Sequence, residues 1–289
     1  MQSIRIFQSL WAMELRRPDG FERSVEENVQ MIADAGYDGV SAHWYDRSYV
    51  QALAPLLRER GLEVEAQSFP KSVEDIIPTL ELAVEFGVHH VAVQPDVRPR
   101  KLEDAIRIIE GWRELGTQAG VSVFFETHRD RMTNDLHFTL DLLDAIPDLT
   151  LLGDISHYVV GREYTFPIDQ QKHDDFHQIL DHVHAFHGRV ASGEQVQLPL
   201  SFAHNEAWFG QFLEWWEYGF RSWRRRAPQD ATLAFTCELG PQPYAIAGPD
   251  GYDLTDRWSE ALLLRDRVLK AWHQSEVGED AAVKMINER

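Results

Sequence analysis

The sequence of 289 residues lacks the features that mark several common classes of protein. Its single cysteine, Cys237, excludes a disulfide within the chain, so we expect a reducing compartment, the cytoplasm. No apolar run approaches the length of about 18 residues that a membrane helix needs, and the first residues do not resemble a signal peptide. A GxGxxG motif after the first predicted strand and a GxxxxGK[ST] motif are also missing, which disfavours the nucleotide-binding folds.

Positive charge is scarce as well. The chain has 28 lysines and arginines against 47 aspartates and glutamates, a formal net charge of −19. A protein that binds nucleic-acid phosphates or an anionic membrane needs a basic surface, so we expect neither partner. A small anionic substrate is still allowed, because a local group of arginines overrides the net charge.

Short apolar segments alternate with amphipathic segments along the whole chain. The predicted strands are residues 4–11, 39–44, 63–69, 89–94, 121–128, 150–154, 183–190 and 232–239. The predicted helices are residues 22–35, 49–60, 73–86, 102–119, 136–145, 173–180, 206–226 and 255–273. Alternation of this kind indicates parallel βα units, and eight units in about 250 residues predict an α/β fold, a single (β/α)₈ TIM barrel. We assign residues 1–275 to the barrel and 276–289 to a polar tail; an open doubly wound sheet is the alternative.

Polar residues stand at the ends of four consecutive predicted strands. We call them the strand-end cluster: Glu126, Asp154, His187 and Glu238. The period of two along a strand places each on the inward face, and the active sites of such barrels lie at the carboxyl ends of the strands. Taken singly, such a carboxylate is more often a helix cap or an arginine partner, and such a histidine a core residue. Four such residues at the same level of one barrel favour a metal site.

The donor set narrows the choice of metal. Three carboxylates and one imidazole suit a single divalent ion, with Mn²⁺ as the first choice and Mg²⁺, Co²⁺ or Zn²⁺ as alternatives. His184 competes with His187 for the imidazole position, but its strand parity places it on the opposite face.

Short motifs around these residues resemble one known family. The sequences FFETH, DISH, HGR and CELGP, which contain the strand-end cluster and His157, are similar to those of the xylose isomerase-like TIM-barrel superfamily, the sugar phosphate isomerases and epimerases. The resemblance implies that the cluster holds a divalent metal and that Glu126 and Glu238 transfer protons. It also implies that His157 contacts the substrate.

Several reactions share the first step that such a site allows. A metal that polarises a carbonyl makes the neighbouring C–H more acidic, so a glutamate can remove that proton. We therefore expect an isomerase or epimerase of a sugar, sugar phosphate or keto-polyol. A lyase or dehydratase acting on a keto-sugar, keto-glycoside or keto-cyclitol is the alternative, and a non-catalytic sugar-binding or scaffold barrel is the third hypothesis.

The AP endonucleases of the superfamily are disfavoured by particular residues. They use three zinc ions and need histidines at the ends of the third and fourth strands, where this chain has Gln67 and Gln94. His89 and His90 start the fourth predicted strand, at the end away from the expected site.

Further polar and aromatic residues at or just after the ends of the predicted strands are candidates for substrate binding. They are Trp11, His43, His128, Arg189 and Tyr244. Strand-end aromatic residues are often only core caps, and His128 is equally compatible with a hydrogen-bonded rim residue. The long segments 159–172 and 191–205 are predicted to determine the substrate. The tryptophans of segment 206–226 indicate packing or an interface between copies of the chain, so a homo-oligomer is compatible with the sequence.

Overall fold

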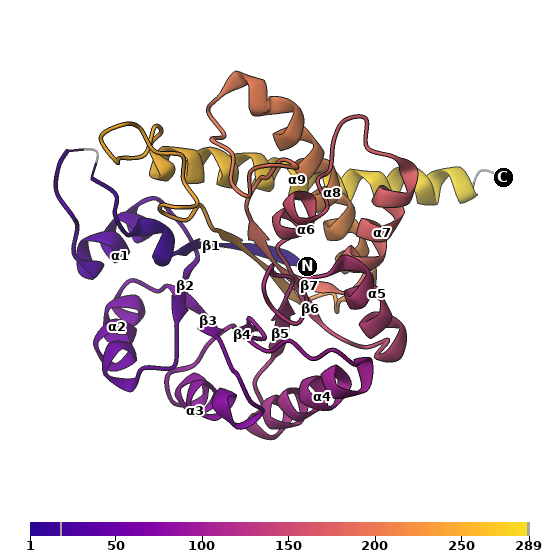
Figure 1. Ribbon diagram of the computed structural model, residues 1–289, viewed down its shortest axis with the longest axis horizontal. Helices are drawn as coiled ribbons and strands as arrows, with labels where there is room; N and C mark the ends of the chain where they lie inside the picture. Colours follow the sequence, from indigo (N-terminus) through magenta and orange to yellow (C-terminus); the bar gives the residue numbers. More distant parts are fainter. Residues whose placement is uncertain (18, 288–289) are drawn as a thin grey trace.

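The strands form one closed parallel barrel. In the computed structural model each strand pairs with the next in chain order, and β1 pairs with β8 to close the ring (Figure 1). The strands are β1 (Ser3–Ser9), β2 (Gly39–His43), β3 (Glu63–Ser68), β4 (His90–Val93), β5 (Val123–Glu126), β6 (Leu151–Gly153), β7 (Val183–Gly188) and β8 (Thr232–Cys237). The structure describes residues 1–17 and 19–287, with side chains as far as Glu276. The predicted (β/α)₈ barrel is confirmed, and the open sheet is excluded.

Helices surround the barrel on its outside (Figure 1). They are α1 (Val25–Asp34), α2 (Arg47–Glu59), α3 (Ile77–Phe86), α4 (Leu102–Ala119), α5 (Leu136–Ala145), α6 (Ser156–Gly161), α7 (Gln170–Leu180), α8 (Glu206–Arg226) and α9 (Arg257–Asn287). The bounds of α4, α5 and α8 are those predicted, whereas α6 was not predicted. Within the described ranges, no helix has the length and apolar character needed to span a membrane.

The last helix is longer than the sequence indicated. α9 continues past the predicted end at residue 273 and runs through the start of the segment that was predicted to be a tail. Ser275 is buried and accepts a hydrogen bond from Nε of Arg224 at 3.0 Å, and Glu276 forms an ion pair with the same arginine at 3.0 Å. Polar contacts with α8 thus replace apolar packing here, which is why the hydrophobic pattern stops before the helix does.

Two layers of apolar side chains make up the core. The outer layer lies between strands and helices and includes three of the four tryptophans of α8, namely Trp215, Trp216 and Trp223, all at most 3% exposed. Their burial within the chain confirms the packing interpretation. The inner layer fills the barrel with apolar residues: Phe7, Ala92, Leu152, Ala185 and Ala234, with Phe124 against them. Leu152, Ala185 and Ala234 were predicted to face inward, so the strand parity is confirmed.

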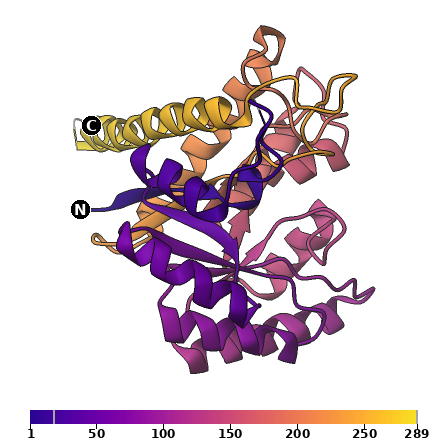
Figure 2. The same ribbon diagram turned by 90° about the vertical axis from the view of Figure 1, so that its left-hand side faces the viewer.

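All strands run in one direction, so their carboxyl ends meet at one end of the barrel. In Figure 2 the start of β1 lies at the left and the long loops after the strands extend to the right. The inner apolar layer therefore forms a floor, and polar residues at or just after the carboxyl ends of β5 to β8 lie above it.

A glycine in this barrel provides a test of the close packing between strands. A Cβ atom at Gly39, the first residue of β2, would lie 2.5 Å from the carbonyl oxygen of Glu63 and 2.7 Å from the ring of Phe7. We expect Gly39→Ala to lower the free energy of unfolding by about 1–3 kcal/mol, as in other overpacked cores. Urea denaturation followed by circular dichroism would measure this change.

Gly210→Ala is the matched control, because a Cβ atom at that position of α8 meets nothing within 4 Å. In a helix this change should stabilise the protein by about 0.5–1 kcal/mol. Equal stabilities for the two variants would contradict the packing described for β2.

Candidate metal centre and substrate cavity

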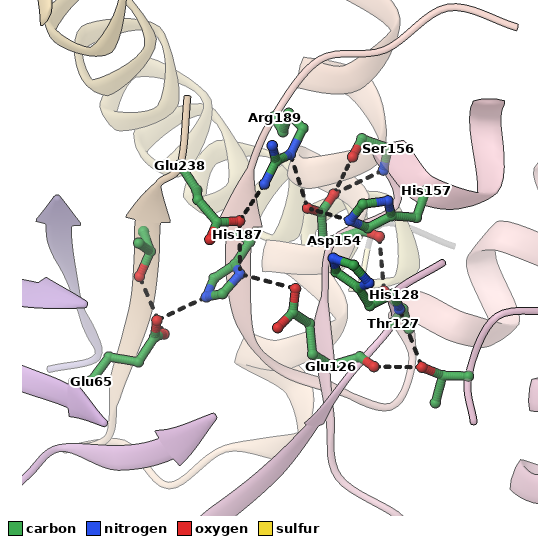
Figure 3. A network of polar contacts seen from close by, with 12 residues as sticks. Glu65, Glu126, Thr127, His128, Asp154, Ser156, His157, His187, Arg189 and Glu238 are labelled. Carbon is green, nitrogen blue, oxygen red and sulfur yellow. Dashed lines mark hydrogen bonds and ion pairs between the residues drawn. The ribbon is translucent and has the colours of Figure 1, made fainter. Parts of the chain in front are cut away.

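The strand-end cluster assembles at the carboxyl end of the barrel. Glu126 is the last residue of β5, His187 lies near the end of β7, and Asp154 and Glu238 directly follow β6 and β8. Each residue offers one ligand atom, and these four atoms all lie within 4.8 Å of one another (Figure 3). All four residues are at most 3% exposed. The structure thus brings together the four residues that the sequence proposed as ligands.

The cluster contains polar atoms without a hydrogen bond. In the described part of the chain, neither carboxylate oxygen of Glu126 has a hydrogen-bond partner, and neither has Nδ1 of His187. A buried polar group left in this way costs several kcal/mol. A divalent cation would satisfy these atoms, and oxygen donors with one imidazole are ligands that Mn²⁺, Mg²⁺ and Co²⁺ accept. The residues present therefore fit a divalent metal.

Arg189 supplies a fixed positive charge at the edge of the cluster. Its guanidinium is 1% exposed and lies 3.3 Å from Oδ2 of Asp154 through Nε and 2.5 Å from Oε2 of Glu238 through Nη2. The predicted substrate contact therefore bridges two candidate ligands. Nη1 also lies 3.4 Å from Oε1 of Gln197, which anchors the arginine from the loop after β7.

A fourth carboxylate lies below the cluster and was not found from the sequence. Glu65 of β3 is fully buried, and its Oε1 lies 2.8 Å from Nε2 of His187. The alternation along β3 places Glu65 on the same face as Gln67, so strand parity is the signal from which Glu65 could have been identified in the sequence. The interior at this level holds the carboxylates of Glu65 and three cluster members, against the basic side chains His187 and Arg189.

The surroundings give the two glutamates of the cluster different pKa values. Burial, together with the negative charges of Glu238 and Asp154, raises the pKa of Glu126 to about 7. Burial alone would also raise the pKa of Glu238, but His187 and Arg189 lower it to about 2. Burial acts to lower the pKa of His187, but the surrounding carboxylates, with Glu65 first, raise it well above its usual value. Glu126 is thus the carboxylate of the pair that most readily holds a proton near neutral pH.

His157 reaches the site because the chain turns directly after β6. Oδ1 of Asp154 accepts hydrogen bonds from the backbone N–H of Ser156 at 3.0 Å and from its hydroxyl at 2.5 Å, and α6 begins at that serine. This turn brings Nε2 of His157 to 3.5 Å from Oδ2 of Asp154. Neither ring nitrogen of His157 has a hydrogen-bond partner among the described residues, so both are available to a ligand.

A second histidine lies against the first. The ring centroids of His128 and His157 are 3.9 Å apart, and Nδ1 of His128 lies 2.6 Å from the carbonyl oxygen of Arg129. Burial lowers the pKa of His128 to about 3 and that of His157 well below its usual value, so both rings are neutral at neutral pH. With Glu126 they form a second group whose ligand atoms lie within 4.8 Å of one another.

A cavity of about 280 Å³ opens above the cluster. It is lined by Trp11, His43, Gln67, Phe69, Gln94, His128, Arg131, Arg189, Glu238 and Tyr244. The five candidates for substrate binding are all among these residues. The segments 159–172 and 191–205 contribute none of the lining residues; the second supports the wall through Gln197, whose Oε1 accepts a hydrogen bond from the N–H of Gly240 at 2.8 Å.

Aromatic rings form one wall of this cavity. Trp11 and Tyr244 meet edge to face with their centroids 5.2 Å apart. The guanidinium of Arg189 lies 4.5 Å from the ring centroid of Tyr244 and 5.7 Å from that of Trp11. The wall is therefore apolar on its surface and cationic at its base.

Known proteins share this architecture. A family model described as xylose isomerase-like TIM barrel matches residues 29–221. No curated protein gives a significant match to the chain.

Similar solved structures include an L-ribulose 3-epimerase, with a TM-score of 0.61, 14% identity, and coverage of 96% of this chain and 98% of that one. A xylose isomerase-like TIM-barrel protein from Mycobacterium smegmatis in complex with magnesium has a TM-score of 0.58 and 14% identity over 93% of this chain and 97% of that one. A D-allulose 3-epimerase from Methylomonas sp. in complex with D-allulose has a TM-score of 0.56 and 13% identity over 95% and 98%. These likenesses establish the fold.

The raised pKa values predict how metal affinity depends on pH. Glu126 and His187 both bind protons more tightly than usual, and each must release its proton to become a ligand. The affinity for Mn²⁺ should therefore increase as the pH rises through about 7 and should fall below it. Isothermal titration calorimetry in buffers of different ionisation enthalpy would measure both the affinity and the number of protons released.

Glu126→Gln should release fewer protons when the metal binds, because the substituted side chain does not titrate. Metal binding that is independent of pH across this range would contradict the assignment of these two residues as ligands.

Proposed function

The chain belongs to the xylose isomerase-like TIM-barrel family, and from this membership we propose that it is a divalent-metal-dependent isomerase or epimerase acting on a sugar or a related keto-polyol. The observation that carries the proposal is the strand-end cluster. Among the described residues, both carboxylate oxygens of Glu126 and Nδ1 of His187 lack a hydrogen-bond partner, and Glu238 of the same cluster lines a cavity of about 280 Å³. The similar structures include two ketose 3-epimerases, one of them in complex with D-allulose.

The strand-end cluster would hold the ion, with Mn²⁺ as the first choice. When bound, a divalent ion polarises a carbonyl group and makes the neighbouring C–H more acidic. The chain's own groups then move the proton. A glutamate must be ionised to bind the ion, so in the metal-loaded cluster Glu126 and Glu238 would both be carboxylates. One of them would remove the substrate proton and, once protonated, would return that proton to the neighbouring carbon.

The cavity walls support a polyhydroxylated substrate. The neutral ring of His128 lines the cavity, and because its Nδ1 is paired with the carbonyl oxygen of Arg129, Nε2 is the nitrogen that would meet a substrate hydroxyl group. His157 lies against this ring and is not among the residues that line the cavity. The amides of Gln67 and Gln94 add further polar groups, and the Nε2 atom of Gln67 has no partner among the described residues. The aromatic wall around Trp11 suits the apolar face of a sugar ring.

Metal content tests the ligand assignment. We expect the wild-type protein to bind close to one Mn²⁺ per chain and to lose its activity on chelation. Glu126→Gln and Glu238→Gln should each weaken binding at least 10-fold, because an amide is a poorer ligand than a carboxylate. Equilibrium dialysis with elemental analysis would measure the stoichiometry.

Glu260→Gln is the matched control, because Glu260 is 5% exposed but accepts its hydrogen bonds from Ser201, away from the cluster. Undiminished metal in the two cluster variants would overturn the assignment.

Isotope exchange tests the reaction. In D₂O with a panel of ketoses and added Mn²⁺, an isomerase or epimerase should return a product of the substrate's formula that carries deuterium at the reacting carbon, read by NMR and mass spectrometry. Release of water or an alcohol would assign a lyase instead. An absence of proton exchange with every ketose and metal tried would leave only a binding role and refute the proposal.

A further inference from the structure

Glu65 contacts His187, the histidine of the strand-end cluster, on the side of the ring that faces away from the other cluster residues. Its carboxylate is fully buried in the barrel, and the reaction proposed above does not use it. Oε1 lies 2.8 Å from Nε2 of His187 (Figure 3). Oε2 lies 2.9 Å from Nε2 of His90 and accepts a hydrogen bond from the hydroxyl of Thr236 at 3.2 Å. Both oxygens are thus satisfied, by residues of three other strands. A buried carboxylate surrounded in this way stays ionised and keeps one orientation.

This contact decides which nitrogen of His187 faces the cluster. An ionised carboxylate only accepts hydrogen bonds, so Nε2 of His187 must carry the proton in the contact with Glu65. In the neutral ring Nδ1 then carries the lone pair. Nδ1 lies 3.2 Å from Oε2 of Glu238 and 3.4 Å from Oε1 of Glu126, which is the interior of the cluster. The lone pair therefore points to the position that a cation would occupy.

His90 prevents Glu65 from turning away. It is buried, and it approaches Oε2 through Nε2 while its Nδ1 lies 2.9 Å from Nδ1 of His89. Its ring lies against Phe124, with centroids 4.9 Å apart, so inner-core packing fixes its orientation. The contacts connect the floor of the barrel to the cluster in the order His89, His90, Glu65, His187.

We propose that Glu65 is a positioning residue that sets the tautomer and the ring orientation of His187, so that Nδ1 is presented to a divalent cation. The inference rests on the proposed metal site and adds to it a residue that does not touch the cation. Carboxylates that accept a hydrogen bond from a metal-bound histidine typically change metal affinity 10–100-fold when removed.

The experiment compares two substitutions at this position. Glu65→Leu removes both acceptors, whereas Glu65→Gln keeps an oxygen that can accept from His187 and turns its NH₂ group toward His90. We expect the Kd for Mn²⁺ to increase 10–100-fold in Glu65→Leu and less in Glu65→Gln. ¹⁵N NMR of the histidines in the Mg²⁺-loaded wild type should show His187 protonated at Nε2 and not at Nδ1, and Glu65→Gln should retain this tautomer.

Ser222→Ala is the matched control. Its buried hydroxyl donates a hydrogen bond to Oδ1 of the partly buried Asp181 at 2.5 Å, so the change removes a contact to a carboxylate away from the cluster. It should lower the melting temperature and leave the Kd for Mn²⁺ unchanged.

The outcomes separate this inference from the proposed function. A wild-type protein that binds no divalent metal would refute the proposed function. A wild-type protein that binds Mn²⁺ with a Kd that Glu65→Leu leaves unchanged would overturn the positioning role alone. If Glu65→Leu does not fold, the wild-type NMR spectrum decides, because a neutral His187 ring protonated at Nδ1 in the metal-loaded protein excludes the role.

Discussion

The structure depends on how buried negative charge is compensated inside the barrel. Four carboxylates, from Glu65, Glu126, Asp154 and Glu238, lie in the interior with at most 3% of each residue exposed. The basic side chains of His187 and Arg189 lie directly among them. Buried carboxylates are tolerated only when opposite charges or donors surround them. The arginine, the histidine and a divalent ion together would meet this requirement, so stability and proposed chemistry depend on the same interactions.

Arg189 connects the charge balance to the cavity. It lies between Asp154 and Glu238 and also beneath the rings of Trp11 and Tyr244. One guanidinium therefore lowers the pKa of Glu238, restrains Asp154 and supports the aromatic wall. His187 and Arg189 thus lower the pKa of Glu238 to about 2, whereas burial and the neighbouring carboxylates raise the pKa of Glu126 to about 7 in the same cluster.

Much of the fold and of the cluster was predictable because both follow from periodicity. The alternation of strands and helices predicted the barrel, and the period of two along each strand identified Leu152, Ala185 and Ala234 as inward-facing. The same parity located Glu126 and His187. Periodicity was less informative after the strands end. The helix α6 was not predicted, because a helix of six residues carries little periodic signal. The extension of α9 was missed because its contacts with Arg224 are polar.

The sequence by itself determined the barrel, the identity of the four cluster residues and the sign of the charge at the site. Local spacing and strand parity encode these features, because each feature concerns residues within a single strand or directly after it. Only the tertiary structure decided what lies around the cluster. Glu65 and His187 are 122 positions apart in the chain and meet across the barrel at 2.8 Å. His90 starts β4 at the end that the sequence marked as remote, yet it holds Glu65 in place. Closure of the barrel brings such residues into contact, and no local pattern records that contact.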